Sequence, residues 1–162
     1  MTETPDAIIK TTTLKAPLNR VWNAIANADE FGIWFGVRFE GPFVAGERLK
    51  GVIAATQVND EIAAAQKPWE GTPFEIVVET IEPKTRFAFR WHPYAADTDY
   101  DYSRDSMTLV TFELTEVDGG VNLTITESGF SQLPPHRRAE AFTMNEGGWQ
   151  AQAGLIEAYL AR

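Results

Sequence analysis

Three side chains of this chain have the chemistry for acid–base work: Glu127, Glu146 and His92. Both carboxylates can reach an apolar interior, and a carboxylate held there can serve as a general acid or base. For Glu127 an ion pair with Arg90 or another strand cation explains the residue equally well. His92 ends a strand, and by alternation it points away from the apolar face, as a surface or rim histidine does. Catalysis by these residues therefore stays one hypothesis among several.

Histidine and cysteine are too few for the usual metal sites. The chain has two histidines, His92 and His136, and no cysteine. We expect His136 to be exposed in the first turn of the last helix. Thiolate ligands, disulfides and a cysteine nucleophile are excluded, and a site with several histidines cannot be built. The prediction is a protein without a resident metal or cofactor.

A short acidic run imitates a calcium-binding loop. Asp97, Asp99 and Asp101 have the spacing with which an EF-hand loop begins. Such a loop needs glycine at its sixth position and glutamate at its twelfth, where this chain has Tyr102 and Thr108. The run is better interpreted as part of a solvated acidic loop.

Other catalytic motifs fail as well. Ser128 precedes Gly129 but lacks the first glycine of a nucleophile elbow. Gly119-Gly120 has the position of a hairpin turn, not of a phosphate-binding loop.

The composition argues against nucleic acids and membranes as partners. The chain has 162 residues and a formal net charge of −9, whereas nucleic acids and anionic membranes are normally bound by clustered Lys and Arg. No basic segment followed by an apolar one opens the chain, and no apolar run approaches the roughly 18 residues of a membrane span. We therefore expect a cytoplasmic protein with no nucleic-acid partner and no membrane insertion.

The elements that must position these residues follow from periodicity. Alternating or β-branched stretches predict strands at 7–15 and 47–58 and antiparallel hairpins over 72–93 and 107–130. Apolar residues at helical spacing predict a short helix from Leu18 to about Asn27, and a second short helix or turn covers 30–35. Two segments, 59–71 with at most one helical turn and 94–106, are loops that either shape a pocket mouth or form solvated surface.

The last thirty residues predict one long helix that closes over the rest. Prolines 134 and 135 open it, and Phe142, Trp149 and Ile156 recur at helical spacing. Gly147-Gly148 interrupts its middle, although each glycine costs about 1 kcal/mol relative to alanine. We expect the helix to bend there or to approach the strands closely, so that a bulky residue at 148 would destabilise the fold or occlude a pocket.

This order predicts a single domain over residues 1–162 with an α+β fold. A curved antiparallel β-sheet wraps around the long C-terminal α-helix, with two short helices after the first strand. The space between sheet and helix is the natural place for a cavity.

Several short motifs agree with that architecture. They lie in order along nearly the whole chain: Ala16-Pro17, Val21-Trp22, Trp34-Phe35, Pro42, Ala45-Gly46-Glu47, 110–114, Gly119-Gly120, 127–130, Asn145 and Gly147-Gly148-Trp149. Together they resemble the SRPBCC superfamily, whose START-like and birch-pollen-allergen-like members have the helix-grip fold. Within it the chain is most similar to the family of activator homologues of the heat-shock-protein-ninety ATPase. The resemblance implies a hydrophobic cavity between sheet and helix.

An interior of rings with two polar groups is the ligand site that this resemblance implies. The chain has five tryptophans and ten phenylalanines, and rings with a few polar groups are how apolar small molecules are generally held. The candidate ligand-binding residues are Trp34, Phe35, Phe74, Phe89, Trp91, Tyr94, Phe112, Phe142, Asn145 and Trp149.

Three functions stay open from the sequence. The first is binding of a hydrophobic or amphipathic small molecule in that cavity. The second, which the resemblance implies, is a co-chaperone-like interaction domain that regulates a heat-shock ATPase, with a chaperone partner. The third is a cavity enzyme of the cyclase, dehydratase or hydrolase type that uses Glu127, Glu146 or His92. A homodimer is a further hypothesis, because acidic single-domain proteins of this class often pair.

Overall fold

An antiparallel sheet and one long helix form the protein, as the sequence predicts, but the sheet has seven strands where the sequence predicts six. The computed structural model describes residues 4–95 and 99–162, so Asp97 of the acidic run lies outside the described residues. In space the strands follow the order β1-β7-β6-β5-β4-β3-β2. Their bounds are β1 (Ala7–Leu14), β2 (Val37–Phe39), β3 (Arg48–Ile53), β4 (Pro73–Glu82), β5 (Arg86–Trp91), β6 (Thr108–Val117) and β7 (Gly120–Ser128).

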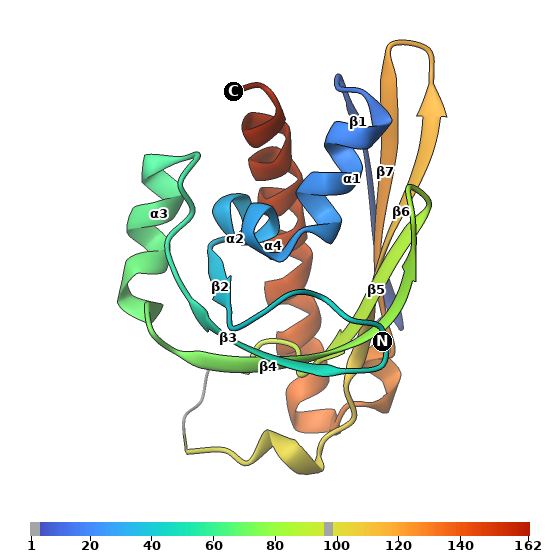
Figure 1. Cartoon of the computed structure of the whole chain (residues 1–162). Helices are drawn as coiled ribbons and strands as arrows, with labels where there is room; N and C mark the ends of the chain where they lie inside the picture. Colours follow the sequence, from blue (N-terminus) through green and yellow to red (C-terminus); the bar gives the residue numbers. More distant parts are fainter. Residues whose placement is uncertain (1–3, 96–98) are drawn as a thin grey trace.

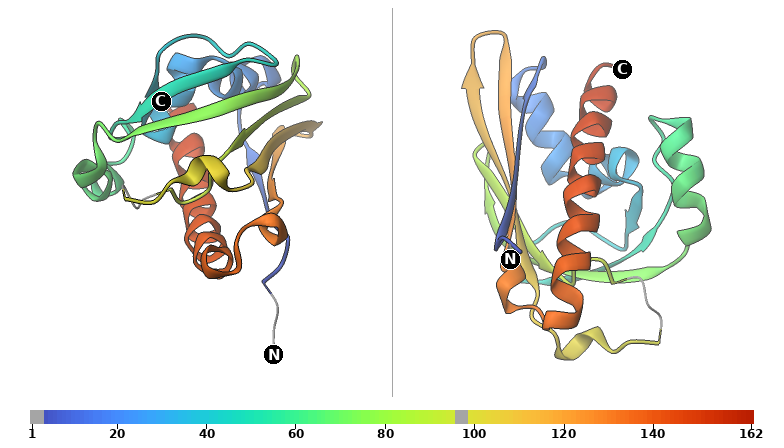
Figure 2. Two further views of the ribbon diagram at one scale, coloured as in Figure 1. Left: turned by 90° about the horizontal axis from the view of Figure 1, so that it is seen from below. Right: turned by 180° about the vertical axis from the view of Figure 1, so that it is seen from behind.

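The helices comprise two short ones after β1, one in the middle of the chain and a long one at its end. They are α1 (Leu18–Ala26), α2 (Ala28–Phe35), α3 (Asp60–Gln66) and α4 (Pro135–Leu160), with 3-10 turns η1 (Lys67–Trp69), η2 (Tyr102–Arg104) and η3 (Phe130–Gln132). The sheet curves around α4, which lies on its concave side, while α3 stands apart at the far edge (Figure 1). Figure 2 shows the same arrangement from below and from behind. Within the described part of the chain, no helix has the length and apolarity that crossing a membrane requires.

The two long hairpins place their apolar residues on one face, which α1, α2 and α4 cover together. In β7 the side chains of Val121, Leu123, Ile125 and Glu127 are all buried, and the residues between them are only half-buried. Side chains along a strand alternate between its two faces, so the period of two that buries the three apolar residues also buries the carboxylate of Glu127.

The middle of the chain differs from the prediction of one long strand over 47–58. β3 ends at Ile53, because Thr56 bonds to other segments instead of to a strand. Its hydroxyl donates to the carbonyl oxygen of Trp34 (2.8 Å), and its N–H donates to the side chain of Gln66 (2.7 Å). Within the segment 59–71, Asp60–Gln66 form the helix α3, capped by Asn59, where the sequence indicated at most one turn. The short strand β2 was not predicted.

The close approach to the strands predicted for the glycine pair in α4 is wrong. Gly147 and Gly148 are exposed, and a Cβ atom added to either would meet nothing within 4 Å. The buried residues of α4 are Ala141, Trp149, Leu155, Ile156 and Tyr159. The glycine pair therefore faces solvent and does not mark an approach to the strands.

We predict opposite effects for alanine at two helical glycines. Gly148→Ala should raise the free energy of unfolding by about 1 kcal/mol, because the new methyl group has space and alanine is the better helix former. In Gly32→Ala the Cβ would lie 2.3 Å from the carbonyl oxygen of Val37, and such a clash costs about 1–3 kcal/mol. Urea unfolding of both variants measures the difference; equal shifts in the two would contradict this account.

Candidate functional site

The carboxylate of Glu127 is completely buried at the junction of sheet and helix. From the sheet, Trp91 Nε1 donates to Oε2 (2.9 Å), and Thr108 Oγ1 donates to the same oxygen (2.5 Å). From α4, Trp149 Nε1 donates to Oε1 (2.8 Å), and the side-chain amide of Asn145 lies 2.9 and 3.2 Å from the two oxygens. One carboxylate thus joins β5, β6, β7 and α4.

Among residues 4–95 and 99–162, the hydrogen-bond donors to this carboxylate are all neutral groups, which contradicts the alternative of an ion pair. Arg90 bonds instead to Glu79 on β4, with Nε 3.2 Å from the carboxylate. A tryptophan N–H can only donate, whereas an ionised carboxylate can only accept, so the group matches the donors around it. Buried charge is tolerated where hydrogen bonds surround it.

The three candidate catalytic residues do not meet at one centre. Glu146 is exposed on α4, whereas the carboxylate of Glu127 is buried among its hydrogen-bond donors. His92 is half-buried, with Nε2 3.2 Å from the carbonyl oxygen of Asp105. The arrangement gives no pair of these groups that faces a common reacting atom.

Five of the predicted ligand-binding rings pack against one another beside Glu127. The contacts run from Phe35 to Trp91 and Trp149, with ring centroids 6.1 and 5.9 Å apart. The two tryptophans are 5.8 Å apart, and Phe112 lies 5.8 Å from Trp149. Phe89 completes the cluster at 5.3 Å from Trp91. Where the sequence predicts a cavity lined by rings, these five rings contact one another.

Three other predicted rings have local structural contacts. Trp34 is fully buried, and its Nε1 donates to the carbonyl oxygen of Ala24 (2.8 Å). Phe74 packs on Phe39 (5.5 Å between centroids). Phe142 packs on Phe130 in η3, at 5.2 Å. Each of these three rings therefore packs against neighbouring residues of the fold.

An open pocket of about 400 Å³ lies at the N-terminal end of α4. Four aromatic rings and three polar side chains line it: Trp69, Tyr94, Tyr100, Tyr102, His136, Arg137 and Glu140. Of these, only Tyr94 belongs to the residues that the sequence singled out as ligand-binding. The walls come from η1, from the segment between β5 and η2 together with Tyr102 of η2, and from the first turns of α4, which are distant in sequence.

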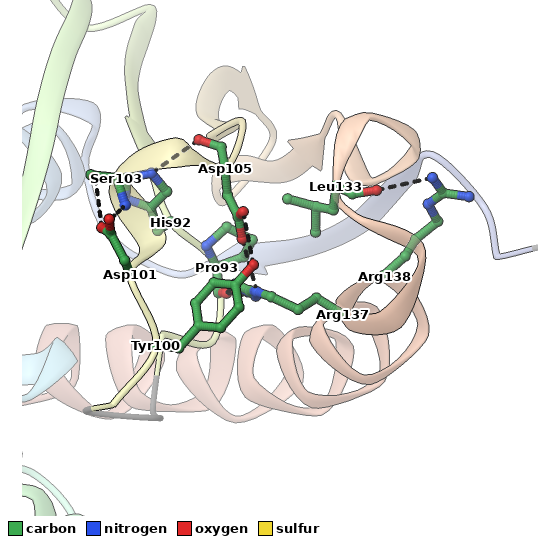
Figure 3. A network of polar contacts seen from close by, with 9 residues as sticks. All are labelled: His92, Pro93, Tyr100, Asp101, Ser103, Asp105, Leu133, Arg137 and Arg138. Carbon is green, nitrogen blue, oxygen red and sulfur yellow. Dashed lines mark hydrogen bonds and ion pairs between the residues drawn. The ribbon is translucent and has the colours of Figure 1, made fainter.

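A buried ion pair holds this end of α4 to the segment before β6. Arg137 Nε lies 3.1 Å from Asp105 Oδ2, and the two side chains are only 10% and 6% exposed. Both terminal nitrogens of Arg137 also donate to the carbonyl oxygen of Pro93, at 3.2 and 2.7 Å. Figure 3 shows this network, with Tyr100 against it. The guanidinium thus ties α4 to the end of β5 and to the tyrosine-bearing segment.

The tyrosines of the pocket wall are positioned by the same network. The hydroxyl of Tyr100 donates to Asp105 Oδ1 (3.0 Å). Partial removal from water raises the pKa of Tyr100, and the hydrogen bond and charge of Asp105 raise it further. The Arg137 guanidinium lies 4.6 Å over the ring of Tyr102 and 5.7 Å over that of Tyr100.

Tyr94 enters the pocket from a left-handed backbone conformation, with φ of +46°. Residues other than glycine seldom adopt that region, where the cost is about 1–3 kcal/mol. The surrounding contacts must hold Tyr94 in place, and strained positions of this kind gather at ligand sites.

Sequence reasoning missed most of this pocket. Its usable signals were the segments 59–71 and 94–106, each interpreted either as a pocket mouth or as solvated surface. The structure favours the first for Trp69, Tyr94, Tyr100 and Tyr102. Nothing in the pattern connected Glu140 with the pocket.

The chain matches a known family over almost its whole length. A sequence profile described as activator of Hsp90 ATPase homolog 1-like protein matches residues 15–161. No curated protein matches the sequence at a significant level.

Solved structures share the fold at low identity. Protein MLL2253 from Mesorhizobium loti is 21% identical, with a TM-score of 0.70 over 96% of this chain and 97% of that one. A protein from Arthrobacter aurescens, solved by NMR, is 15% identical, with a TM-score of 0.72 over 96% and 86% of the two chains. The Aha1 dimer from Colwellia psychrerythraea is 14% identical, with a TM-score of 0.65 over 95% of each chain.

We predict that Glu127→Gln destabilises the protein by about 2–4 kcal/mol. Whichever way the new amide lies, its NH2 group would face the N–H of Trp91 or Trp149, and neither can accept a hydrogen bond. The measurement is the free energy of unfolding in urea. Glu113→Gln on the exposed side of β6 is the matched control and should change it by less than about 0.5 kcal/mol. A similarly small change in Glu127→Gln would show that the donor cluster contributes little.

Proposed function

The chain belongs to the activator of Hsp90 ATPase homolog 1-like family, and we propose that it binds an amphipathic small molecule in the pocket at the N-terminal end of α4. The observation that carries this proposal is a volume of about 400 Å³ lined by four aromatic rings and three polar groups. Ligand pockets typically enclose about 300–1,000 Å³ and combine apolar walls with a few polar groups.

Two further features support this location over the middle of the helix. The rings beside Trp149 contact one another, so a ligand there would have to displace them. At the end of α4, by contrast, Trp69 is 50% exposed and lines an open volume. Burying an exposed tryptophan against a ligand is favourable, because large rings remove much apolar area from water.

We expect 2-naphthol, an aromatic probe with one polar group, to bind saturably at this pocket. Its addition should shift the indole N–H signal of Trp69 in a nitrogen-15 NMR spectrum. Trp69→Ala should weaken binding about tenfold, since the loss of one ring contact is worth roughly 1.4 kcal/mol. Ile9→Ala removes an exposed apolar side chain from β1 and serves as the control. Binding that is equally strong in both variants would place the site elsewhere, and no saturable binding would refute the proposal.

The family match supports a second candidate, regulation of a heat-shock ATPase through a protein interface. The profile described as activator of Hsp90 ATPase homolog 1-like covers residues 15–161. The Colwellia psychrerythraea Aha1 was solved as a dimer with the same fold, so we include self-association in this proposal. The test adds the full chain to the Hsp90 of its own host and measures ATP hydrolysis, with the oligomeric state measured by sedimentation. An unchanged ATPase rate over a wide excess of the chain would exclude the regulatory role.

A further inference from the structure

We propose that the pocket at the N-terminal end of α4 selects an organic cation, held against aromatic rings and the carboxylate of Glu140. This inference rests on the proposed binding function and gives the chemical class of its ligand. It follows from the charges on the pocket wall, taken one at a time.

The positive side chain in the wall is already compensated. Arg137 forms a buried ion pair with Asp105 at 3.1 Å, and its two terminal nitrogens donate to the carbonyl oxygen of Pro93. An anionic ligand would have to compete with Asp105 for this guanidinium. The pair as a whole carries no net charge and repels neither sign strongly.

The negative side chain in the wall has no such partner. Glu140 is exposed on α4 and lines the pocket, and none of the ion pairs among residues 4–95 and 99–162 involves it. Its position, one helical turn after Arg137, puts both on one face of the helix. Since Arg137 and Asp105 compensate each other, the carboxylate of Glu140 is the uncompensated acidic group of the wall.

The rings around this carboxylate are suited to a cation. The negative face of an aromatic ring attracts a cation within about 6 Å, and aromatic cages are a recurring way to bind quaternary ammonium groups. Arg137 already uses this attraction, since its guanidinium lies over the rings of Tyr102 and Tyr100. Trp69 and Tyr94 line the remaining pocket wall and can serve a bound cation in the same way. The net charge of −9 also draws cations toward the protein.

Three probes of similar shape and different charge test the inference on the full chain. They are choline, its neutral carbon analogue 3,3-dimethylbutan-1-ol, and the anion 3,3-dimethylbutanoate. Each is titrated while the Trp69 indole N–H signal is followed by NMR. Choline should bind about 2–5-fold more tightly than the neutral alcohol, the factor that a cation–ring contact at an exposed site supplies. The anion should bind most weakly.

The variant Glu140→Gln separates the contribution of the carboxylate to binding from that of the rings. It should weaken the binding of choline and leave the binding of the neutral alcohol unchanged, and the preference for choline that remains is the contribution of the rings. The matched control is Glu157→Gln, an exposed carboxylate on the same helix about 25 Å further along its axis. It should preserve the preference.

The outcomes distinguish this inference from the function on which it rests. If the alcohol or the anion binds as tightly as choline, the selection of cations is wrong and the pocket remains a binding site. If choline fails to shift Trp69 while 2-naphthol does, the inference is also overturned. If neither choline nor 2-naphthol binds, both this inference and the proposed binding function are refuted.

Discussion

A carboxylate taken out of water has to find hydrogen-bond donors inside the protein, and Glu127 finds them on β5, β6 and α4 at once. Two indole N–H groups, a hydroxyl and an amide converge on it, at 2.5–3.2 Å. These donors come from elements that are otherwise joined by apolar packing, which is less directional. The cluster therefore sets the rotation and height of α4 against the sheet, on which the remaining contacts depend.

The position of α4 has consequences at both of its ends. Near its middle, Trp149 is held by Glu127 and packs on Trp91 and Phe112. Near its start, the same placement brings the Arg137 guanidinium within 3.1 Å of Asp105 and within hydrogen-bonding distance of the carbonyl oxygen of Pro93. The interior is therefore filled by rings where the helix crosses the sheet, and an open volume is left where the helix begins.

Local patterns were sufficient to predict most of the fold. In the hairpins over 72–93 and 107–130, apolar and polar residues alternate clearly and the turn residues are strong. The two strands that pair in each hairpin are also close in sequence. The strand at 47–58 failed because Thr56 bonds to α2 and α3, segments whose approach no local pattern records. The glycine pair at 147–148 was misjudged for the same reason. A glycine indicates close packing only where another segment lies next to the position that its Cβ would occupy.

The sequence by itself determined the α+β architecture and the single long closing helix, because each depends on a short-range period, whereas it left the surroundings of Glu127 open. The partners of that carboxylate were decided only by the tertiary structure. Arg90 was an equally good candidate by sequence, but its guanidinium forms an ion pair with Glu79 on the neighbouring strand β4. The pocket was likewise a product of tertiary structure, since Trp69, Tyr94 and Glu140 come from three separate segments. Periodicity says which side of an element a residue occupies, whereas a site between elements depends on how they are rotated and spaced, which is settled by packing over the whole chain.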